Sequence, residues 1–406
     1  MNLRDKLKKF EKNQKPHRSK EEIEYKNKDA FNNQLISNNM GTYLKSVNDY
    51  KNEYKHGLYQ IDQLKEQLDT EILFKIANNK STKLNDEIIG NLLFIDTETT
   101  GLMGGTGTVS FLIGAGYFTA GDFVIEQYLM RDYDEEAAML QDFKEIMGNH
   151  NIIVSFNGKS FDLPLIKTRL IMNRFDRPNY DYHLDLLHSA RRLWSFLDSC
   201  SLKSLERNIL NFERIDDVPG HLIPGLYFEF LENKNLELLA PVLEHNIYDI
   251  LSLVTLFTHL KEIHLDNVDN LDSNELFHLG RIKEKEKNYH DCIDYLEASV
   301  ENSEESTLKY RALKKLSWQY KRIDRYDKAA EIWKEMIDQK KQGIFPYVEM
   351  AKYLEHKKKN FKEALNYTNQ AIEMLNERRI IINNFDKKIK NLEHRKERLI
   401  KKSSKI

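Results

Sequence analysis

One stretch decides the fold predicted for this chain: Leu92-Leu93-Phe94-Ile95-Asp96-Thr97-Glu98-Thr99-Thr100-Gly101. Its apolar run predicts a buried strand. Side chains alternate faces along a strand, so Asp96 and Glu98 are expected on one face near the strand end. Two carboxylates this close repel each other unless a cation lies between them. A lone D-x-E also suits a solvated strand end followed by a turn, so a metal site requires further carboxylates downstream.

The composition indicates a chain with enough apolar residues to build cores. Charged residues make up 31% and hydrophobic residues 40% of the 406 positions. At roughly 150 residues per domain, two or three domains are expected. No apolar run approaches the roughly 20 residues of a membrane helix, and the N-terminal MNLRDKLKKFEKNQK lacks an apolar signal region. The two cysteines form no disulfide or zinc spacing. A cytoplasmic protein without membrane contact is therefore expected.

The two ends of the chain are polar and basic. Residues 1–57 are rich in lysine, asparagine and glutamate, which predicts a largely disordered segment. Apolar residues at helical spacing predict a helical lead-in over 58–87. A basic helical tail is expected over 378–406. Basic ends fit a nucleic-acid partner, and they fit solvated helices equally well.

The block 88–264 alternates strands with helices. The first three strands are separated by short connections, which predicts an antiparallel meander. The order β-β-β-α-β-α-β-α predicts a mixed sheet with helices on its faces, in the α/β class. Strands are expected over 91–95, 109–118, 123–130, 152–156 and 183–187, and helices over 134–147, 162–172, 202–210 and 236–263.

An internal repeat begins after the α/β block, over 272–377. Aromatic residues at 289, 326 and 361 are each followed three positions later by a small residue, at intervals of 37 and 35 residues. Such a period predicts stacked helical hairpins similar to tetratricopeptide repeats. Arrays of this kind offer an interaction surface. An ordinary helical bundle is the alternative.

Two further segments place acids where they could meet the opening motif. Asp162 ends the sequence SFNGKSFD and opens a predicted helix, where an aspartate is also a simple N-cap. His245 and Asp249 are four residues apart on a predicted helix and share one face, as surface pairs also do. Taken together, the three segments give D-x-E on a first strand, N-x3-F-D near a helix start and H-x3-D on a late helix.

This ordered set resembles the DEDD exonuclease superfamily of the ribonuclease-H-like fold. It is most similar to the YprB-like branch, which pairs such a domain with tetratricopeptide-like repeats. The resemblance covers about 90–260 and implies an α/β ribonuclease-H-like mixed sheet followed by an all-α helical repeat domain. The segments that carry it are DTETTGL (96–102), SFNGKSFDLP (155–164), HLDLLHSARRLW (183–194), CSLKSLE (200–206), DVPGHLIPGLYFEFL (217–231) and HNIYDILSL (245–253).

The resemblance also implies a set of site residues. Asp96, Glu98, Asp162 and Asp249 match the four carboxylates that hold two divalent ions, Mg²⁺ or Mn²⁺. Hard cations prefer such oxygen ligands, and a pair of ions suits phosphodiester hydrolysis. His245 is the expected general base, although it stands at the spacing of the superfamily's tyrosine class.

Three other residues are expected near the substrate. Thr97 lies between the two strand carboxylates. Asn157 follows a strand, where a simple turn residue is an equal alternative. Asp185 lies in the last short strand near the site and is a candidate for either an acid that supports the metal ligands from behind or an auxiliary acid.

The function implied by the resemblance is a metal-dependent 3′–5′ exonuclease acting on nucleic acid. DNA in repair is the preferred substrate and RNA the alternative, with a helicase or another protein docked on the repeats. The rival hypothesis is a non-catalytic scaffold that binds nucleic acid and recruits its partner through the repeats. An endonuclease on the same fold is a third hypothesis.

Overall fold

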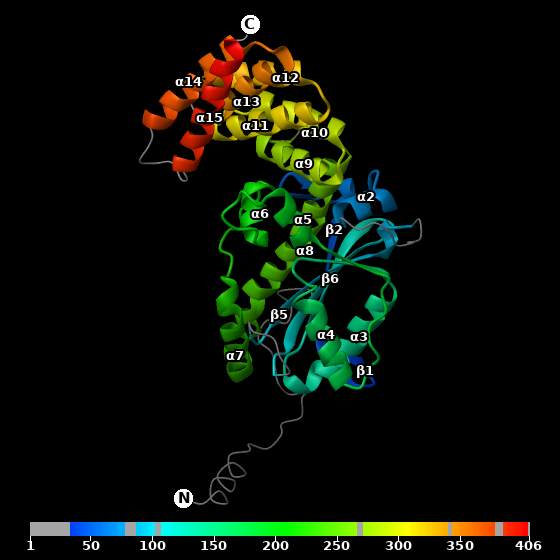
Figure 1. Ribbon diagram of the computed structural model, residues 1–406. Coiled ribbons are helices and arrows are strands. Elements are labelled where there is room, and N and C mark those ends of the chain that lie inside the picture. Colours follow the sequence, from blue (N-terminus) through cyan, green and yellow to red (C-terminus); the bar gives the residue numbers. More distant parts are fainter. Residues whose placement is uncertain are drawn as a thin grey trace, which may run out of the picture. The chain divides into compact units, whose positions relative to one another are not determined.

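The computed structural model describes residues 33–77, 87–101, 107–265, 271–339, 343–377 and 385–404. The chain divides into two compact units (Figure 1). One contains residues up to 190 together with 199–266, and the other contains 191–198 and the residues from 267 onward. Among the described helices, none has both the length and the apolar character that a membrane span needs.

A seven-stranded mixed sheet forms the core of the first unit, in the order β1-β2-β7-β6-β5-β8-β9. Strands β5, β6 and β7 form the antiparallel meander, and β8 and β9 run parallel to β5. The prediction of a mixed α/β sheet is therefore confirmed. The strands are β1 (Asn33–Asn38), β2 (Gly41–Lys51), β5 (Leu92–Thr99), β6 (Ser110–Phe118), β7 (Asp122–Leu129), β8 (Ile152–Ser155) and β9 (Tyr182–Asp185).

The prediction of a largely disordered segment over 1–57 is wrong for residues 33–51, which form strands β1 and β2. β2 pairs along eight residues of β7, and β1 pairs with β2. In antiparallel strands with one solvated face, that face keeps polar side chains, so neither strand has a continuous apolar run in its sequence. Tyr43 and Leu44 are nevertheless fully buried in the core. Residues 1–32 lie outside the described residues.

The predicted lead-in over 58–87 is a series of short elements. A small hairpin joins β3 (Lys55–His56) to β4 (Tyr59–Gln60). It is followed by the 3₁₀ helix η3 (Ile61–Lys65) and by α2 (Thr70–Ala77). The lead-in is thus helical only in part, and 78–86 lie outside the described residues.

Helices cover both faces of the sheet, and the alternation along β5 assigns each face. Leu93 and Ile95 share a core with residues of α3 (Glu136–Gly148) and α4 (Asp162–Met172). On the other face, the Phe94 ring centroid lies 6.4 Å from that of Phe257 on α8. The remaining helices of this block are η4 (Ile89–Asn91), η5 (Tyr133–Glu135), α5 (Leu186–Leu193), α6 (Leu202–Asn208), η6 (Gly220–Leu222), α7 (Ile223–Asn233), η7 (Leu236–Leu239) and α8 (Ala240–His264).

Helix α8 approaches β6 closely because two residues of that strand are glycines. A Cβ on Gly114 would lie 2.3 Å from Oδ1 of Asn246. A Cβ on Gly116 would lie 2.5 Å from Cγ2 of Ile250. Any larger residue at either position would push α8 away from the sheet.

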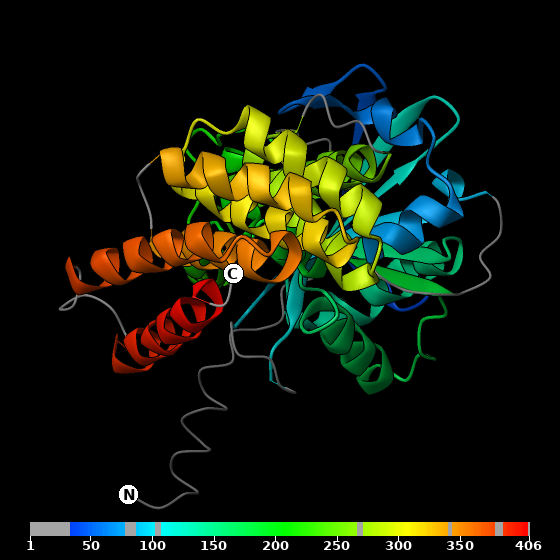
Figure 2. The ribbon, with the colours of Figure 1, turned by 45° about the horizontal axis from the view of Figure 1, so that its top comes forward.

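The second unit is helical in its described residues, which confirms the predicted helical domain (Figure 2). Residues of the segment 191–198 belong to this unit, where Nε1 of Trp194 donates to Oε1 of Glu275 at 2.8 Å. The assignment to tetratricopeptide repeats stays a prediction. The helices are α9 (Ser273–Glu286), α10 (Tyr289–Asn302), α11 (Ser306–Arg322), α12 (Tyr326–Asp338), α13 (Phe345–Tyr353) with its π-helical extension η9 (Leu354–Lys358), α14 (Phe361–Glu377) and α15 (Phe385–Ser403).

The sequence repeat marks the turn inside each helical hairpin. A non-glycine residue in the left-handed region ends the first helix, and the repeat's aromatic residue begins the second. The small residue three positions later is buried, so the paired helices pack closely. The left-handed residues are Lys287, Asp324 and Lys359, with φ of 63°, 57° and 55°.

The basic tail is partly engaged within this unit. The buried carboxylate of Glu355 accepts hydrogen bonds from Arg395, Arg398 and Lys402 on α15. Burial raises the pKa of Glu355, but the hydrogen bonds from Arg398 and Lys402 outweigh this effect and lower the pKa to about 2. Three cations of the tail therefore hold α15 in place.

We expect Tyr43→Ala to lower the free energy of unfolding by about 3–5 kcal/mol, because it opens a cavity under β2. The Tyr43 ring stacks on Tyr128, and its hydroxyl donates to Oδ2 of Asp142 at 2.8 Å. Tyr43→Phe should cost only about 1 kcal/mol. Urea unfolding measures both. Leu35→Ala, at a side chain that is 48% exposed on β1, is the control. A Tyr43→Ala protein as stable as this control would contradict the burial of β2.

Candidate active site

Asp96 and Glu98 both project from β5 toward α8, as strand alternation predicts. Nδ2 of Asn246 donates to Oδ2 of Asp96 at 2.9 Å. Oε1 of Glu98 lies 3.8 Å from Nε2 of His245. The pairing of β5 with β6 shifts register between Glu98 and Thr99. Bulges of this kind re-aim side chains and are frequent beside active sites.

Asp162 reaches the same place from α4. The N-cap of this helix is Phe161, so the expectation that Asp162 is the N-cap is wrong. Asp162 is instead the first helical residue, and its Oδ1 accepts a hydrogen bond from Oγ1 of Thr97 at 2.5 Å. Thr97 thus holds Asp162 at the end of β5.

Helix α8 contributes Asp249 and His245, one turn apart. Nε2 of His245 lies 3.4 Å from Oδ2 of Asp249. One ligand atom each from Glu98, His245 and Asp249 lies within 4.8 Å of the others, which is close enough to share one metal ion. The structure thus brings the four carboxylates and His245 together from β5, α4 and α8.

Asp185 and Asn157 shape the loop that leads to α4. The buried carboxylate of Asp185 accepts the backbone N–H of Asn157 at 2.8 Å and that of Lys159 at 3.1 Å. Asn157 adopts the left-handed region, with φ of 65°. Both carboxylate oxygens of Asp185 are engaged in this way, so the geometry favours an anchor for the loop over a free acid.

Arg214 is a buried cation of the site that the sequence analysis missed. Its guanidinium is 2% exposed and donates to Oδ1 of Asp249 and to both carboxylate oxygens of Glu206. Burial opposes its charge, but Asp249 and Glu206 raise the pKa of Arg214 above its usual value. One oxygen of Asp249 is therefore occupied by Arg214, while the other faces His245.

Asp217 is the second residue whose role the sequence analysis missed, although it begins the quoted segment DVPGHLIPGLYFEFL (217–231). Its Oδ1 lies 2.6 Å from Nδ1 of His245, and Nζ of Lys203 donates to its Oδ2 at 3.0 Å. Burial raises the pKa of Asp217, but these two hydrogen bonds lower it below the usual value. Nη1 of Arg214 also lies 3.3 Å from Nδ1, but the shorter contact is with the carboxylate, which only accepts, so the geometry favours the proton on Nδ1. In that tautomer of the neutral imidazole, Nε2 is the acceptor, and it faces Glu98 and Asp249.

The arrangement crowds like charges into a poorly solvated place. Burial, and next the charge of Asp249, raise the pKa of Asp96 and of Glu98 well above the usual range. Burial also raises the pKa of Asp162 to about 6. Oxygen ligands with unrelieved mutual repulsion fit hard divalent cations such as Mg²⁺ or Mn²⁺.

Comparison with known proteins assigns the family. The family model of the RNase H superfamily matches residues 93–261, which contain every residue of this site. YprB of Bacillus subtilis (strain 168) is 34% identical over 330 residues, covering 80% of this chain and 79% of YprB. The chain belongs to the YprB-like family of the RNase H superfamily. Members of this superfamily are usually nucleases and typically bind divalent metals.

A more distant likeness exists among solved structures. The family B DNA polymerase from the hyperthermophilic archaeon Pyrobaculum calidifontis matches this YprB-like chain with a TM-score of 0.33 and 11% identity. The match covers 59% of this chain and 33% of the polymerase chain. A TM-score this low does not bear on function.

We expect Mn²⁺ to raise the melting temperature more at pH 8 than at pH 5.5. The site acids have raised pKa values in the folded state, so the folded protein binds protons more tightly than the unfolded chain. Without metal, stability therefore falls as the pH rises from about 4 through about 6 and above. The cation binds the charged form and relieves this loss. Thermal unfolding with and without Mn²⁺ measures the effect.

Asp162→Asn should reduce this pH-dependent Mn²⁺ effect. The matched control is Asp176→Asn, because the Asp176 side chain is fully exposed. This control should behave as the wild type. An equal Mn²⁺ shift at both pH values would contradict the assignment of the carboxylates to metal.

Proposed function

We propose that this protein is a divalent-metal-dependent 3′–5′ exonuclease that hydrolyses phosphodiester bonds, with DNA as its preferred substrate and RNA as the alternative. One observation carries the proposal: four carboxylates from β5, α4 and α8 converge beside a histidine in a poorly solvated cluster. A pure binding scaffold gains nothing from gathering these like charges, since the burial of charged groups costs stability.

The carboxylates Asp96, Glu98, Asp162 and Asp249 would hold two ions of Mg²⁺ or Mn²⁺. These ions supply nucleophile activation and charge neutralisation when bound. The chain supplies orientation: Asn246 fixes Asp96 at 2.9 Å. Thr97 fixes Asp162, and Arg214 fixes Asp249.

His245 is the proposed general base. Its Nδ1 is held by Asp217 at 2.6 Å, which leaves Nε2 to accept a proton from the attacking water. The position of Nε2 near Glu98 and Asp249 also allows His245 to be a metal ligand. If His245 is the base, loss of Asp217 lowers turnover. If His245 is a metal ligand, loss of Asp217 lowers metal affinity.

The polarity of cleavage and the role in DNA repair rest on the resemblance to DEDD exonucleases. The competing proposal is a non-catalytic scaffold that recruits a helicase or another protein through its helical hairpins. The order of the site acids along the chain favours the enzyme.

We expect the wild type with Mn²⁺ to release nucleotides from 3′ ends, and Asp96→Asn to lower the rate by at least about 100-fold, because it weakens the carboxylate site for the ions that would neutralise the reacting phosphate. Oligonucleotides of DNA and RNA, single- and double-stranded and labelled at either end, measure polarity and sugar preference together. Asp176→Asn is again the matched control.

Equal degradation by wild type and Asp96→Asn would contradict the proposal. Cleavage of circular DNA would indicate an endonuclease, and binding without cleavage would indicate the scaffold.

We expect Asp217→Asn to lower turnover by about 10²–10⁴-fold, because an amide can donate to Nδ1 and place the proton on Nε2. Mn²⁺ affinity should change far less than turnover. Kinetics and calorimetric Mn²⁺ titration measure the two effects. The control is Lys203→Gln, which removes only the solvent-side partner of Asp217. If Mn²⁺ affinity falls as much as turnover does, His245 is a metal ligand rather than the base.

A further inference from the structure

The helical unit concentrates positive charge at the turns inside its hairpins. We define the turn edge as residues 283–289, 321–328 and 355–362. These segments carry eleven lysines and arginines against five acids, while the whole chain has a formal net charge of −2. The connection between α10 and α11, at the other end of these helices, carries Glu304 and Glu305. With eleven basic residues against five acids, the turn edge is a strongly basic surface of the helical unit.

Each turn aromatic meets a cation from the element that follows its hairpin. This arrangement recurs three times, so it belongs to the repeat and is not a single chance contact. Aromatic and cationic groups together bind the flat, charged units of a nucleic-acid strand. The pairs are Arg322 over Tyr289 at 5.6 Å, Lys357 over Tyr326 at 3.8 Å and Lys402 over Phe361 at 5.5 Å.

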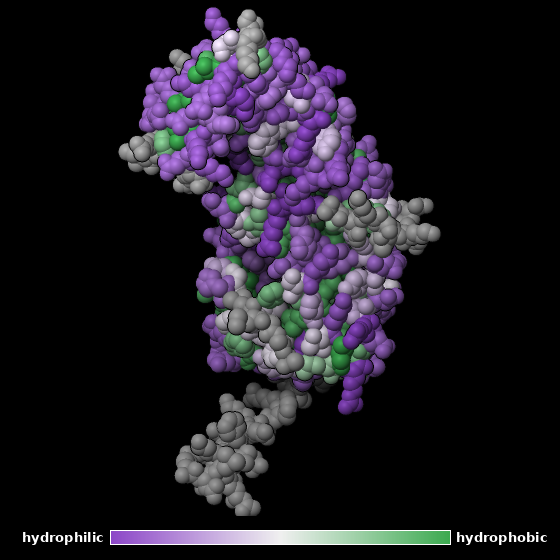
Figure 3. Space-filling view, in the orientation of Figure 1, coloured by the Kyte–Doolittle hydropathy of each residue, from purple (hydrophilic) through white to green (hydrophobic). Residues whose placement is uncertain are grey.

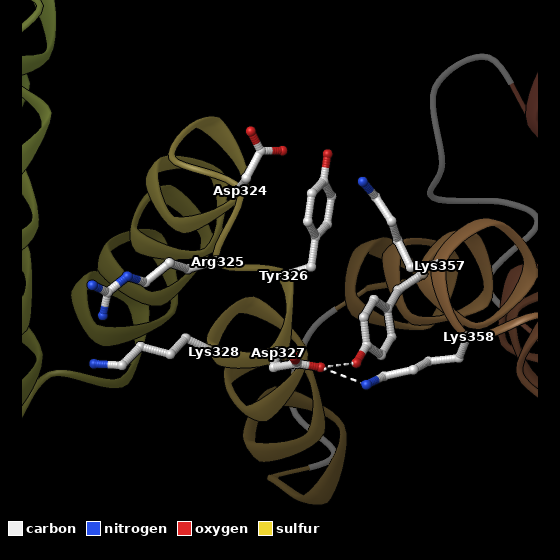
Figure 4. Close-up of a pocket in the computed structure, with 8 residues that line it drawn as sticks. Asp324, Arg325, Tyr326, Asp327, Lys328, Lys357 and Lys358 are labelled. Atoms are coloured by element: carbon white, nitrogen blue, oxygen red, sulfur yellow. Dashed lines mark hydrogen bonds and ion pairs between the residues drawn. The ribbon is translucent and has the colours of Figure 1, made fainter.

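Two hollows lie at equivalent positions of successive hairpins. The first, of about 630 Å³, is lined by Lys285, Lys287 and Tyr289 among others. The second, of about 450 Å³, is lined by residues that include Tyr326 and Lys357, whose side chains project to the same side (Figure 4). Each hollow thus combines an aromatic ring with lysines from the turn edge.

The acids in these hollows are largely neutralised by the protein itself. Glu284 pairs with Lys315 and Arg322. Asp327 accepts from the hydroxyl of Tyr353 and pairs with Lys358 at 2.8 Å (Figure 4). The remaining lysines of the hollows are exposed and give the turn edge a positive potential.

Cation–π contacts can also stabilise turns in the absence of any ligand. This alternative would account for one cation beside each aromatic ring. It does not explain the exposed Lys285 and Lys287, which lie beside a ring already covered by Arg322. The face of the helical unit in Figure 3 is mostly hydrophilic, which favours a charged ligand over an apolar peptide. A polymer of repeated charged and aromatic units fits a surface on which the cation–aromatic pair recurs in three successive hairpins.

We propose that the turn edge binds single-stranded nucleic acid, with phosphates on lysines such as Lys287 and Lys357 and bases against Tyr289 and Tyr326. The choice of nucleic acid as the polyanion rests on the proposed nuclease function. Binding of this kind depends on counterion release and on stacking, so it is salt-dependent and tolerant of sequence.

The test is the binding of a fluorescent single-stranded DNA of about 30 nucleotides to the full chain, followed by anisotropy at several salt concentrations. All proteins carry Asp96→Ala, so the readout is binding and is independent of cleavage. The double variant Lys287→Gln/Lys357→Gln is compared with Lys309→Gln/Lys334→Gln. The control pair removes the same charge from the other end of α11 and α12. Circular dichroism verifies that both remain helical.

We expect the turn-edge variant to bind about tenfold more weakly at 50 mM salt. The magnitude of the slope of log binding constant against log salt concentration should fall by about 1.4, since each lost phosphate contact on a single strand removes about 0.7. The control should stay within about twofold of the parent. Equal binding by both variants would overturn the proposal. A second result would also overturn it. If labelled polyglutamate binds more tightly than DNA, and only the turn-edge variant loses this binding, the ligand is an acidic protein and not a nucleic acid. Failure of the nuclease assay would leave this binding result unaffected.

Discussion

The close approach of α8 to the sheet is the constraint on which the site depends. Gly114 is the register partner of Asp96, and its missing side chain lets Asn246 lie over the strand. Asn246 then bonds to Asp96 and accepts from Nε2 of Gln127 at 2.9 Å. The same helix carries His245 and Asp249, so its distance from β5 and β6 sets the distances among the site residues. A helix held farther out would leave the carboxylates of β5 facing water.

That packing brings carboxylates close together, and the site residues relieve their mutual repulsion only in part. Buried acids from four elements meet, and Arg214 neutralises Glu206 and one oxygen of Asp249. The acids nearest β5 keep raised pKa values, which is the signature of a site prepared for cations or protons. Stability is given up locally so that binding energy is available, as is usual for functional sites.

The helical unit is built by repetition of one hairpin. Its hairpins repeat one packing arrangement, with a left-handed residue, an aromatic and a buried small residue at each turn. Cations over the aromatic rings add charge to this structural repeat.

The sequence by itself determined what depends on local periodicity. The face shared by Asp96 and Glu98, the helix face shared by His245 and Asp249, the meander and the period of the hairpins all follow from regular strand or helix geometry. The strands β1 and β2 escaped prediction because the pairing of β2 with β7 is non-local and the solvated faces of both strands are polar. Only the tertiary structure decided that Arg214 and Asp217 join residues 28 to 35 positions away, and that Asp185 anchors a loop. Such contacts arise from packing between elements, for which the spacing of residues in the sequence carries no signal.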